Sequence, residues 1–213
     1  MNDPSVPPLR RAVEVMDRLR SPGGCAWDAE QTAESLARYL IEECYEVLEA
    51  IETGDVRLLR EELGDLLLQV LFHARIAQEL PSGQAFGIDE VAADLVDKLM
   101  RRHPHVFAAD GQPPSSAADL NETWEQQKIV EKGRTSAVDG VPIAQPALAL
   151  TAKLVSRAAR AGLSVETSSA TDEIGDRLLA VVQDAVAVGI DPETALRRRA
   201  RALRASIKIA ESR

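Results

Sequence analysis

The chain has 213 residues, and its hydrophobic content of 45% with only 3% aromatic residues predicts an aliphatic core that suits packed helices better than a β-sandwich. A formal net charge of -9 disfavours general affinity for nucleic acid or for an anionic membrane surface. No apolar run approaches the roughly 18 to 20 residues of a membrane helix, and the N-terminus lacks the apolar segment of a signal peptide. We therefore expect a soluble, cytoplasmic protein in which Cys25 and Cys44 stay reduced.

The predicted elements are helices, because no segment shows the sustained alternation of polar and apolar residues that is typical of a strand. Apolar residues recur at helical spacing over 9–20. A second helix is expected over 30–53 and a third over 56–79, with Gly54 ending the second and Asp55 as the N-cap of the third. Since so few residues separate these two helices, they should form an antiparallel hairpin.

The chain beyond this hairpin is also expected to be helical. A fourth helix over 90–102 should be capped by Asp89 and followed by a loop or flap over 104–118. Another helix is predicted over 119–132, and further helices over 146–213. The fold class is therefore all-α, an antiparallel helical bundle.

Carboxylates stand among the leucines and valines of the predicted hairpin. Glu43 and Glu46 are three residues apart, as are Glu62 and Asp65, so each pair shares one face of its helix. Glu46 lies eight residues before Gly54, and Glu62 lies eight residues after it. Both pairs should therefore lie at a similar height above the turn and approach each other when the leucine-rich stripes close the hairpin.

Four converging carboxylates would repel one another and raise one another's pKa. A hard divalent cation removes this penalty, and a ligand set of oxygens alone favours Mg²⁺ or Mn²⁺ over zinc or copper. Magnesium also commonly bridges protein carboxylates to the phosphates of a substrate. The alternative is a solvated acidic face that holds no metal.

The acidic residues form a recognisable pattern. "EECYE" (42–46) followed by "ELGD" (62–65) fits EExxE–spacer–ExxD with a spacer of fifteen residues, 47–61. Four further motifs occur in the same order, "CAWDAEQT" (25–32), "DKLMRRHPHVF" (97–107), "NETWEQQK" (121–128) and "PALALTAKL" (146–154). On these motifs the chain resembles the MazG family of nucleoside triphosphate pyrophosphohydrolases over about residues 9–165.

The resemblance implies the fold of the all-α NTP pyrophosphohydrolases, Mg²⁺ dependence, and a homodimer or higher homo-oligomer. The implied reaction cleaves a nucleoside triphosphate between its α and β phosphates to the monophosphate and pyrophosphate. By the same resemblance, the metal ligands would be Glu43, Glu46, Glu62 and Asp65.

The resemblance also assigns the substrate-binding residues. Lys98 and Arg102 would contact the triphosphate, and their spacing places both cations on one helical face. Asn121, Trp124 and Lys128 match positions that hold the base and the phosphates, with Trp124 stacking on the base.

Several roles stay open at this point. Glu42 or Glu61, adjacent to the ligand pairs, would serve as general base or orient the water, and the sequence does not choose between them. Trp27 is expected to be structural or to help shape the pocket, and His73 to pack in the core. Stacking on one tryptophan tolerates every base, so we expect broad specificity and a role in housekeeping or nucleotide-pool control. The alternative is a non-catalytic helical regulatory protein that binds a nucleotide or a metal.

The chain also contains an internal repeat, in which "ELGDLLLQVLFHARIA" (62–77) aligns with "EIGDRLLAVVQDAVAV" (173–188). The second copy keeps Glu173 and Asp176 but is not preceded by an EExxE motif. With half of the ligand set, it should be inactive.

Two domains are therefore expected. Residues 1–145 would form the MazG-like catalytic domain, with a core at about 9–132, and residues 146–213 a shortened, degenerate second copy. We expect the second copy to serve in packing or as a dimer contact. Its arginine-rich segment, 197–204, is expected to be a solvated helix face rather than a nucleic-acid site.

Overall fold

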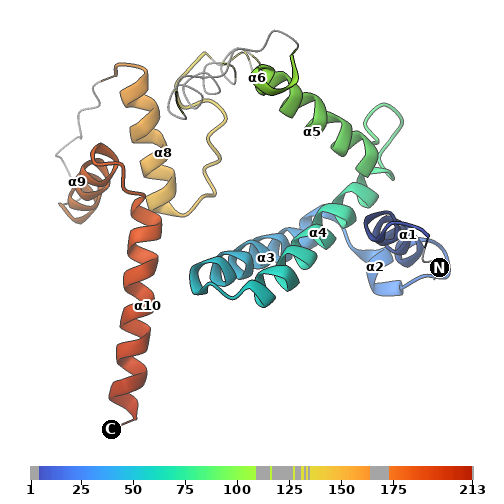
Figure 1. Ribbon diagram of the computed structural model, residues 1–213, viewed down its shortest axis with the longest axis horizontal. Coiled ribbons are helices and arrows are strands. Elements are labelled where there is room, and N and C mark those ends of the chain that lie inside the picture. The colour runs from blue at the N-terminus through green and yellow to red at the C-terminus, as the bar shows by residue number, and fades with distance from the viewer. Residues whose placement is uncertain are drawn as a thin grey trace. The chain divides into compact units, whose positions relative to one another are not determined.

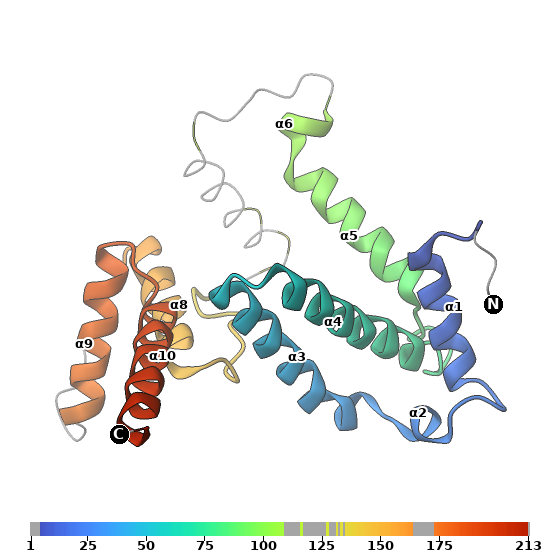
Figure 2. The same ribbon diagram turned by 60° about the horizontal axis from the view of Figure 1, so that its bottom comes forward.

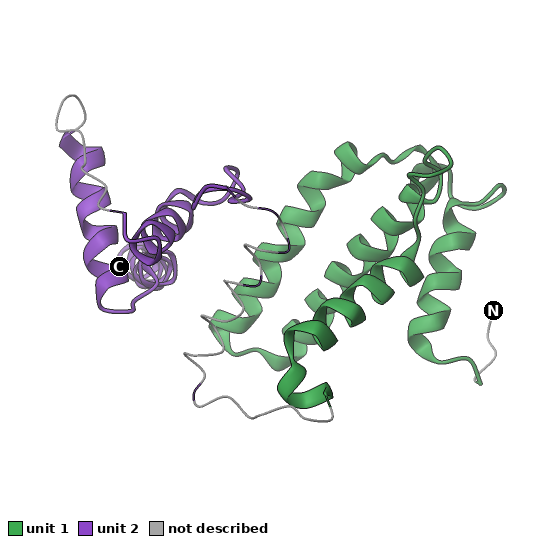
Figure 3. Cartoon of the chain, turned by 90° about the horizontal axis from the view of Figure 1, so that it is seen from above, with its two compact units in different colours: residues 1–114 green, residues 115–213 purple. Residues whose placement is uncertain are grey.

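The computed structural model describes residues 5–108, 116, 127, 131, 133, 135–163 and 173–212. Throughout these residues the regular structure is helical, which confirms the predicted all-α class. The chain divides into two compact units, residues 1–114 and 115–213, which are coloured separately in Figure 3. None of the described helices combines the length and the apolar content that crossing a bilayer requires.

The predicted hairpin is present in the first unit, where α3 (Ala33–Thr53) and α4 (Val56–Ala77) lie side by side in opposite directions (Figures 1 and 2). Gly54 ends α3 with a φ of 72°, a left-handed conformation that glycine adopts without a steric penalty. The carboxylate of Asp55 accepts hydrogen bonds from the amides two and three residues further on, so it is the predicted N-cap of α4.

Two further helices precede the hairpin, α1 (Pro8–Arg20) and the short α2 (Ala26–Glu30). The sequence did not predict α2, whose five residues are too few to show a helical period. The helix expected from residue 30 begins at Ala33, because Thr32 and Ser35 form a reciprocal capping box at its start. The core that joins α1 to the hairpin consists of Met16, Leu36, Leu71 and Phe72.

Arg20 connects the parts of this unit. Its side chain is 6% exposed, and its guanidinium donates to both carboxylate oxygens of Glu79 and to the backbone carbonyls of Asp28 and Gln31. A single side chain thus ties the end of α1 to α2 and to the residues just after α4. The network is extended by Arg75, which donates to Glu79 as well.

Part of the leucine-rich stripe is more exposed than the sequence predicts. On α3, Leu36 is buried, but Ile51 is exposed. On α4, Leu63 is 49% exposed and Val70 is exposed too. The physical reason is the placement of α1, since every buried residue of α4 lies from Gln69 onward.

The fourth predicted helix is α5 (Ile88–Arg102), and a short helix, α6 (Pro104–Phe107), follows it. The expected cap, Asp89, lies in the first turn instead. Gly87 is the N-cap, and its amide donates to the carboxylate of Glu90, so the prediction for Asp89 was wrong.

The second unit contains three described helices, α8 (Ala147–Arg160), α9 (Glu173–Ala187) and α10 (Pro192–Glu211). Asp191 caps α10 by accepting a hydrogen bond from the Thr194 amide. Most of the helix predicted over 119–132 lies outside the described residues.

Candidate metal and nucleotide site

The hairpin brings carboxylates of α3 and α4 together. Glu43, Glu62 and Asp65 each offer an oxygen, and these oxygens all lie within 4.8 Å of one another. Glu43 and Glu62 are half-buried, whereas Asp65 is exposed. Residues that lie eight to eleven positions from Gly54 on the two sides of the turn thus meet, because the turn pairs the two helical faces.

Glu46 lies next to this cluster without being one of its three members. It is exposed, and its side chain hydrogen-bonds that of Glu43. Its charge also acts on Glu62 across the hairpin. The four carboxylates predicted from the sequence therefore lie within electrostatic reach of one another.

The surroundings raise the pKa of two of these carboxyl groups. For Glu43 the largest cause is desolvation, followed by the hydrogen bond with Glu46 and by the charges of Asp65, Glu46 and Glu62. For Glu62 desolvation again comes first, followed by the charges of Glu46, Asp65 and Glu61. Both groups hold their protons more tightly than an ordinary glutamate.

This donor set fits a hard divalent cation. All of the converging atoms are carboxylate oxygens, the ligands that Mg²⁺ and Mn²⁺ prefer. A cation held by Glu43, Glu62 and Asp65, with Glu46 in reach, would offset the repulsion among these carboxylates, which adds to desolvation in raising the pKa of Glu43 and Glu62.

Glu42 and Glu61 are both exposed. Each is adjacent in the chain to a clustered glutamate, and consecutive helical side chains point about 100° apart. The charge of Glu61 nevertheless acts on Glu62. Glu42 and Glu61 are thus both accessible to a water near the cluster, and either could act as the general base.

The predicted triphosphate contacts, Lys98 and Arg102, both lie in α5, four residues apart. Lys98 is exposed and Arg102 is half-buried. The helix α5 contacts α4, and none of the residues of α5 is fully buried. Asn121, Trp124 and Lys128 lie outside the described residues.

Other side chains along the hairpin have properties that sequence reasoning missed. Gln69 is 5% exposed, and its Oε1 is buried with no hydrogen-bond partner in the described chain; the same holds for Nε2 of His73. Trp27 is 50% exposed, with its ring 6.3 Å from that of Tyr39 and 6.5 Å from that of Phe72, both edge-on. For Gln69, the sequence did contain a signal, because a glutamine stands one turn beyond Asp65 in a leucine-rich helix.

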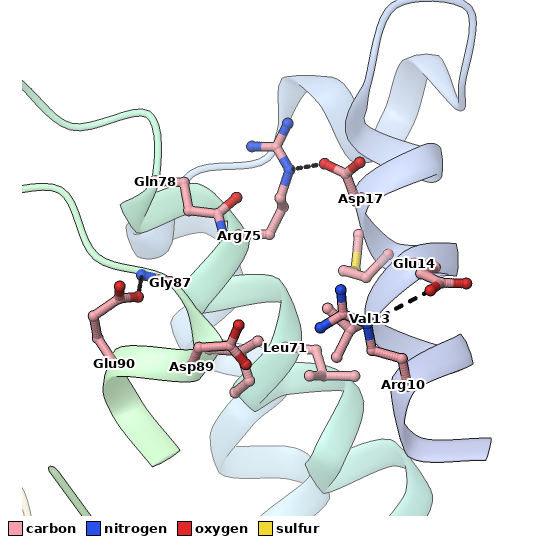
Figure 4. A pocket seen from close by; sticks show the side chains of 12 residues that line it. Arg10, Val13, Glu14, Asp17, Leu71, Arg75, Gln78, Gly87, Asp89 and Glu90 are labelled. Atoms are coloured by element: carbon pink, nitrogen blue, oxygen red, sulfur yellow. Dashed lines mark hydrogen bonds and ion pairs between the residues drawn. The ribbon is translucent and has the colours of Figure 1, made fainter. Parts of the chain in front are cut away.

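A separate cavity of about 380 Å³ lies between α1, α4 and the start of α5 (Figure 4). Several of the charged side chains that line it form ion pairs with one another. Arg75 donates to Asp17, and Arg10 pairs with Glu14. The α4 residues that line it begin at Leu71, on the side of the helix opposite Glu62, so this cavity is distinct from the carboxylate cluster.

Comparison with known proteins agrees with this geometry. The family model "MazG nucleotide pyrophosphohydrolase domain" matches residues 31–107, a range that contains both carboxylate pairs as well as Lys98 and Arg102. The chain is 40% identical to the nucleoside triphosphate pyrophosphohydrolase/pyrophosphatase MazG of Thermotoga maritima, over 89% of this chain and 80% of that protein. It is 38% identical to the nucleoside triphosphate pyrophosphohydrolase of Escherichia coli K12, over 89% and 82%.

The chain belongs to the MazG family. A protein of Mycobacterium tuberculosis named nucleoside triphosphate pyrophosphohydrolase is 47% identical over 87% of this chain, which spans about half, 53%, of that relative. A crystal structure of a MazG-related protein from Thermotoga maritima aligns with 56% of this chain and 97% of its own length, at 28% identity and a TM-score of 0.45. Membership makes this MazG protein an enzyme, a nucleoside triphosphate pyrophosphohydrolase.

Proposed function

We propose that the enzyme hydrolyses nucleoside triphosphates between the α and β phosphates and releases the nucleoside monophosphate and pyrophosphate. The reaction depends on Mg²⁺, for which Mn²⁺ can substitute. The observation that supports this proposal is the convergence of Glu43, Glu62 and Asp65 within 4.8 Å, with Glu46 beside them, in a MazG hairpin.

In this proposal the four carboxylates hold the cation from two helices of one rigid hairpin. A bound divalent cation supplies charge neutralisation for the phosphates and lowers the pKa of a water. Glu42 or Glu61 accepts the proton of the attacking water, or orients that water toward the α phosphorus.

The remaining roles fall to residues outside the hairpin. Lys98 and Arg102 stabilise the negative charge that develops on the departing pyrophosphate. Asn121, Trp124 and Lys128 hold the base and the phosphates, with Trp124 stacking on the base. Broad base specificity follows from such stacking, because every base has a π-face. A role in nucleotide housekeeping fits that breadth.

The working form in this proposal is a homodimer or a higher homo-oligomer. The support is the exposed apolar surface of two helices, contributed on α4 by Leu63, Leu67, Leu68 and Val70 and on α5 by Leu95, Val96, Leu99 and Met100. A surface of this kind commonly marks a protein interface.

We further propose that residues 1–145 form the catalytic domain and that 146–213 form a degenerate second copy that serves in packing or as a dimer contact. In α9, Glu173 and Asp176 stand where the repeat has Glu62 and Asp65. The lack of a preceding EExxE motif leaves this pair without the second half of a ligand set.

The decisive experiment identifies the products. ³¹P NMR of a nucleoside triphosphate incubated with the enzyme and Mg²⁺ should show monophosphate and pyrophosphate, and EDTA should prevent their formation. Glu62→Gln should abolish the reaction, whereas Glu173→Gln, the same change in the degenerate copy, should not. Release of diphosphate and inorganic phosphate would contradict the cleavage position. No release from ribo-, deoxy- or oxidised triphosphates would favour the non-catalytic binder.

A further inference from the structure

One polar atom of Gln69 and one of His73 are buried on α4, within two turns of Asp65, without a hydrogen-bond partner among the described residues. Asp65, Gln69 and His73 follow one another at intervals of four residues, so they share one side of α4. Oε1 of Gln69 and Nε2 of His73 are both inaccessible, and neither has a partner among the described residues. A polar stripe thus continues from the cluster toward the end of the hairpin nearest α2.

Such atoms destabilise a fold, because a buried polar group that leaves water and gains no hydrogen bond loses free energy. A leucine in place of Gln69 would fill the same space without that loss. Residues that reduce stability without a structural gain are expected where a protein binds or transforms something. The unfilled hydrogen-bonding capacity of Gln69 and His73 is therefore suited to a ligand.

Trp27 marks where such a ligand would lie. Its ring is half exposed, and the edge-on contacts with Tyr39 and Phe72 fix its orientation. Tyr39 precedes the ligand Glu43 by one helical turn, and Phe72 follows Gln69 by one turn. The aromatic ring is therefore fixed to the same two helices that carry the carboxylates.

The spacing along α4 matches the layout of a nucleotide. Seven residues separate Asp65 from Phe72, which is about 10 Å of helix at 1.5 Å per residue. Gln69 lies between the carboxylates at one end and the Trp27 ring at the other. This order places groups that can bind phosphate at one end, and hydrogen-bonding groups with an aromatic ring at the other, as the phosphates and the base of a nucleotide would require.

We propose that this end of the hairpin is the nucleobase subsite, in which Trp27 stacks on the base and Gln69 and His73 hydrogen-bond its edge. The inference rests on the proposed function, because it takes the carboxylates as the phosphate end of the site. A carboxamide offers an acceptor on one side and a donor on the other, and rotation exchanges them. Gln69 therefore accepts any base, which gives a physical reason for broad specificity. Trp27 adds an aromatic platform to the one predicted at Trp124.

The test compares a ligand that has a base with one that lacks it. Isothermal titration calorimetry of the full chain with Mg²⁺ would use ATP with a methylene bridge between its α and β phosphates, and inorganic tripolyphosphate. Trp27→Ala should weaken nucleotide binding about tenfold, the effect of one lost stack, and Trp27→Phe should weaken it less. Neither change should alter tripolyphosphate binding. Loss of affinity for both ligands to the same degree overturns the proposal.

Gln69→Leu provides a second readout that a structural role would not produce. The variant should lose nucleotide affinity by about tenfold while its melting temperature without ligand stays equal or rises, because a buried unsatisfied group has been removed. Gln78→Leu, the same change just beyond the end of α4, should leave the affinities for both ligands unchanged. A lowered melting temperature with unaltered nucleotide affinity in Gln69→Leu would show that Gln69 is structural.

The outcomes separate this inference from the proposed function. If the wild-type enzyme binds the nucleotide analogue through Trp27 and Gln69 but releases no pyrophosphate from ATP, the subsite stands and the hydrolytic function fails. If it releases pyrophosphate while both variants bind nucleotide and tripolyphosphate as the wild type does, the function stands and the subsite is wrong.

Discussion

At Glu43 and Glu62, desolvation and neighbouring carboxylates raise the pKa of a group that must be ionised to bind a metal. A divalent cation held by these carboxylates would offset their mutual repulsion and favour their ionised forms.

Removing one ligand charge should remove activity without unfolding the protein. Glu43→Gln or Asp65→Asn should reduce turnover to less than about a tenth of the wild-type rate, because a neutral amide is a poor ligand for a hard cation. Helicity measured by circular dichroism should not change, since neither carboxylate caps a helix. A variant that kept more than about a tenth of the rate would count heavily against the metal assignment.

The raised pKa values also predict how metal binding depends on pH. A carboxyl group with a raised pKa favours the folded state while it is protonated, and this contribution is lost as the pH rises through the folded-state pKa. A cation reverses this, because it binds only the ionised form. The increase in melting temperature on adding Mg²⁺ should therefore be large at neutral pH and fade as the pH falls through the raised pKa of Glu43 and Glu62. An increase that is the same at pH 5 and pH 8 would contradict this.

Arg20 should be important for stability rather than for chemistry. Arg20→Ala would leave the carbonyls of Asp28 and Gln31 without their donor and remove both bonds to Glu79, which should reduce the free energy of unfolding by about 2 kcal/mol. Chemical denaturation would measure this change. Arg18→Ala is the matched control and should have a smaller effect, because this neighbouring arginine donates to the backbone carbonyls of Pro22 and Gly23 in an exposed loop.

The pKa of Glu79 is shifted in the opposite direction from the pKa of Glu43 and Glu62. The hydrogen bond from Arg20 is the largest cause that holds the pKa of Glu79 below its ordinary value. Its contribution to stability is therefore present above the unfolded-state pKa and is lost as the pH falls through the lowered folded-state pKa.

At the scale of helices, the turn between α3 and α4 depends on one glycine. Gly54 has a φ of 72°, where a residue with a side chain is strained. Gly54→Ala should therefore reduce the free energy of unfolding by about 1 kcal/mol, measured by chemical denaturation. Gly64→Ala, in the interior of α4 with open space around it, should instead stabilise by up to about 1 kcal/mol. Equal effects at the two positions would show that the turn does not need glycine.

The sequence predicted the hairpin because its signals were local. Helical periodicity, Gly54 and the Asp55 cap act within a few residues, and the structure has all three. The predictions that failed concern choices between neighbouring caps, where Gly87 replaced Asp89, or burial that depends on distant helices. Leu63 shows the latter, because its exposure follows from where α1 packs.

The candidate site was predictable to a similar extent. The spacing of the carboxylates is a local property of α3 and α4, so the sequence predicted that Glu43, Glu62 and Asp65 converge, and their oxygens do lie within 4.8 Å of one another. Gln69 could not be identified, because its significance comes from being buried without a hydrogen-bond partner. Periodicity predicts which face a residue lies on but does not show which of its atoms lack partners.

At the scale of the whole molecule, the exposed apolar surface of α5 predicts self-association. Leu99→Glu should shift the protein toward a monomer in light scattering after gel filtration, because a charge at a buried interface has no compensation. Asp94→Asn, on the same helix, should leave the mass unchanged. If the wild-type protein is already a monomer at micromolar concentration, the proposal of a homo-oligomer is wrong.

The tight turn at Gly54 and Asp55 has a consequence for how the protein can evolve. One residue inserted into either arm between the turn and the carboxylates would rotate that arm's pair by about 100° and displace it by about 1.5 Å. Only insertions that add about the same number of whole turns to both arms, such as seven residues each, would keep the pairs opposed. The distance between the two halves of this motif is therefore expected to drift among descendants in discrete, matched steps rather than one residue at a time.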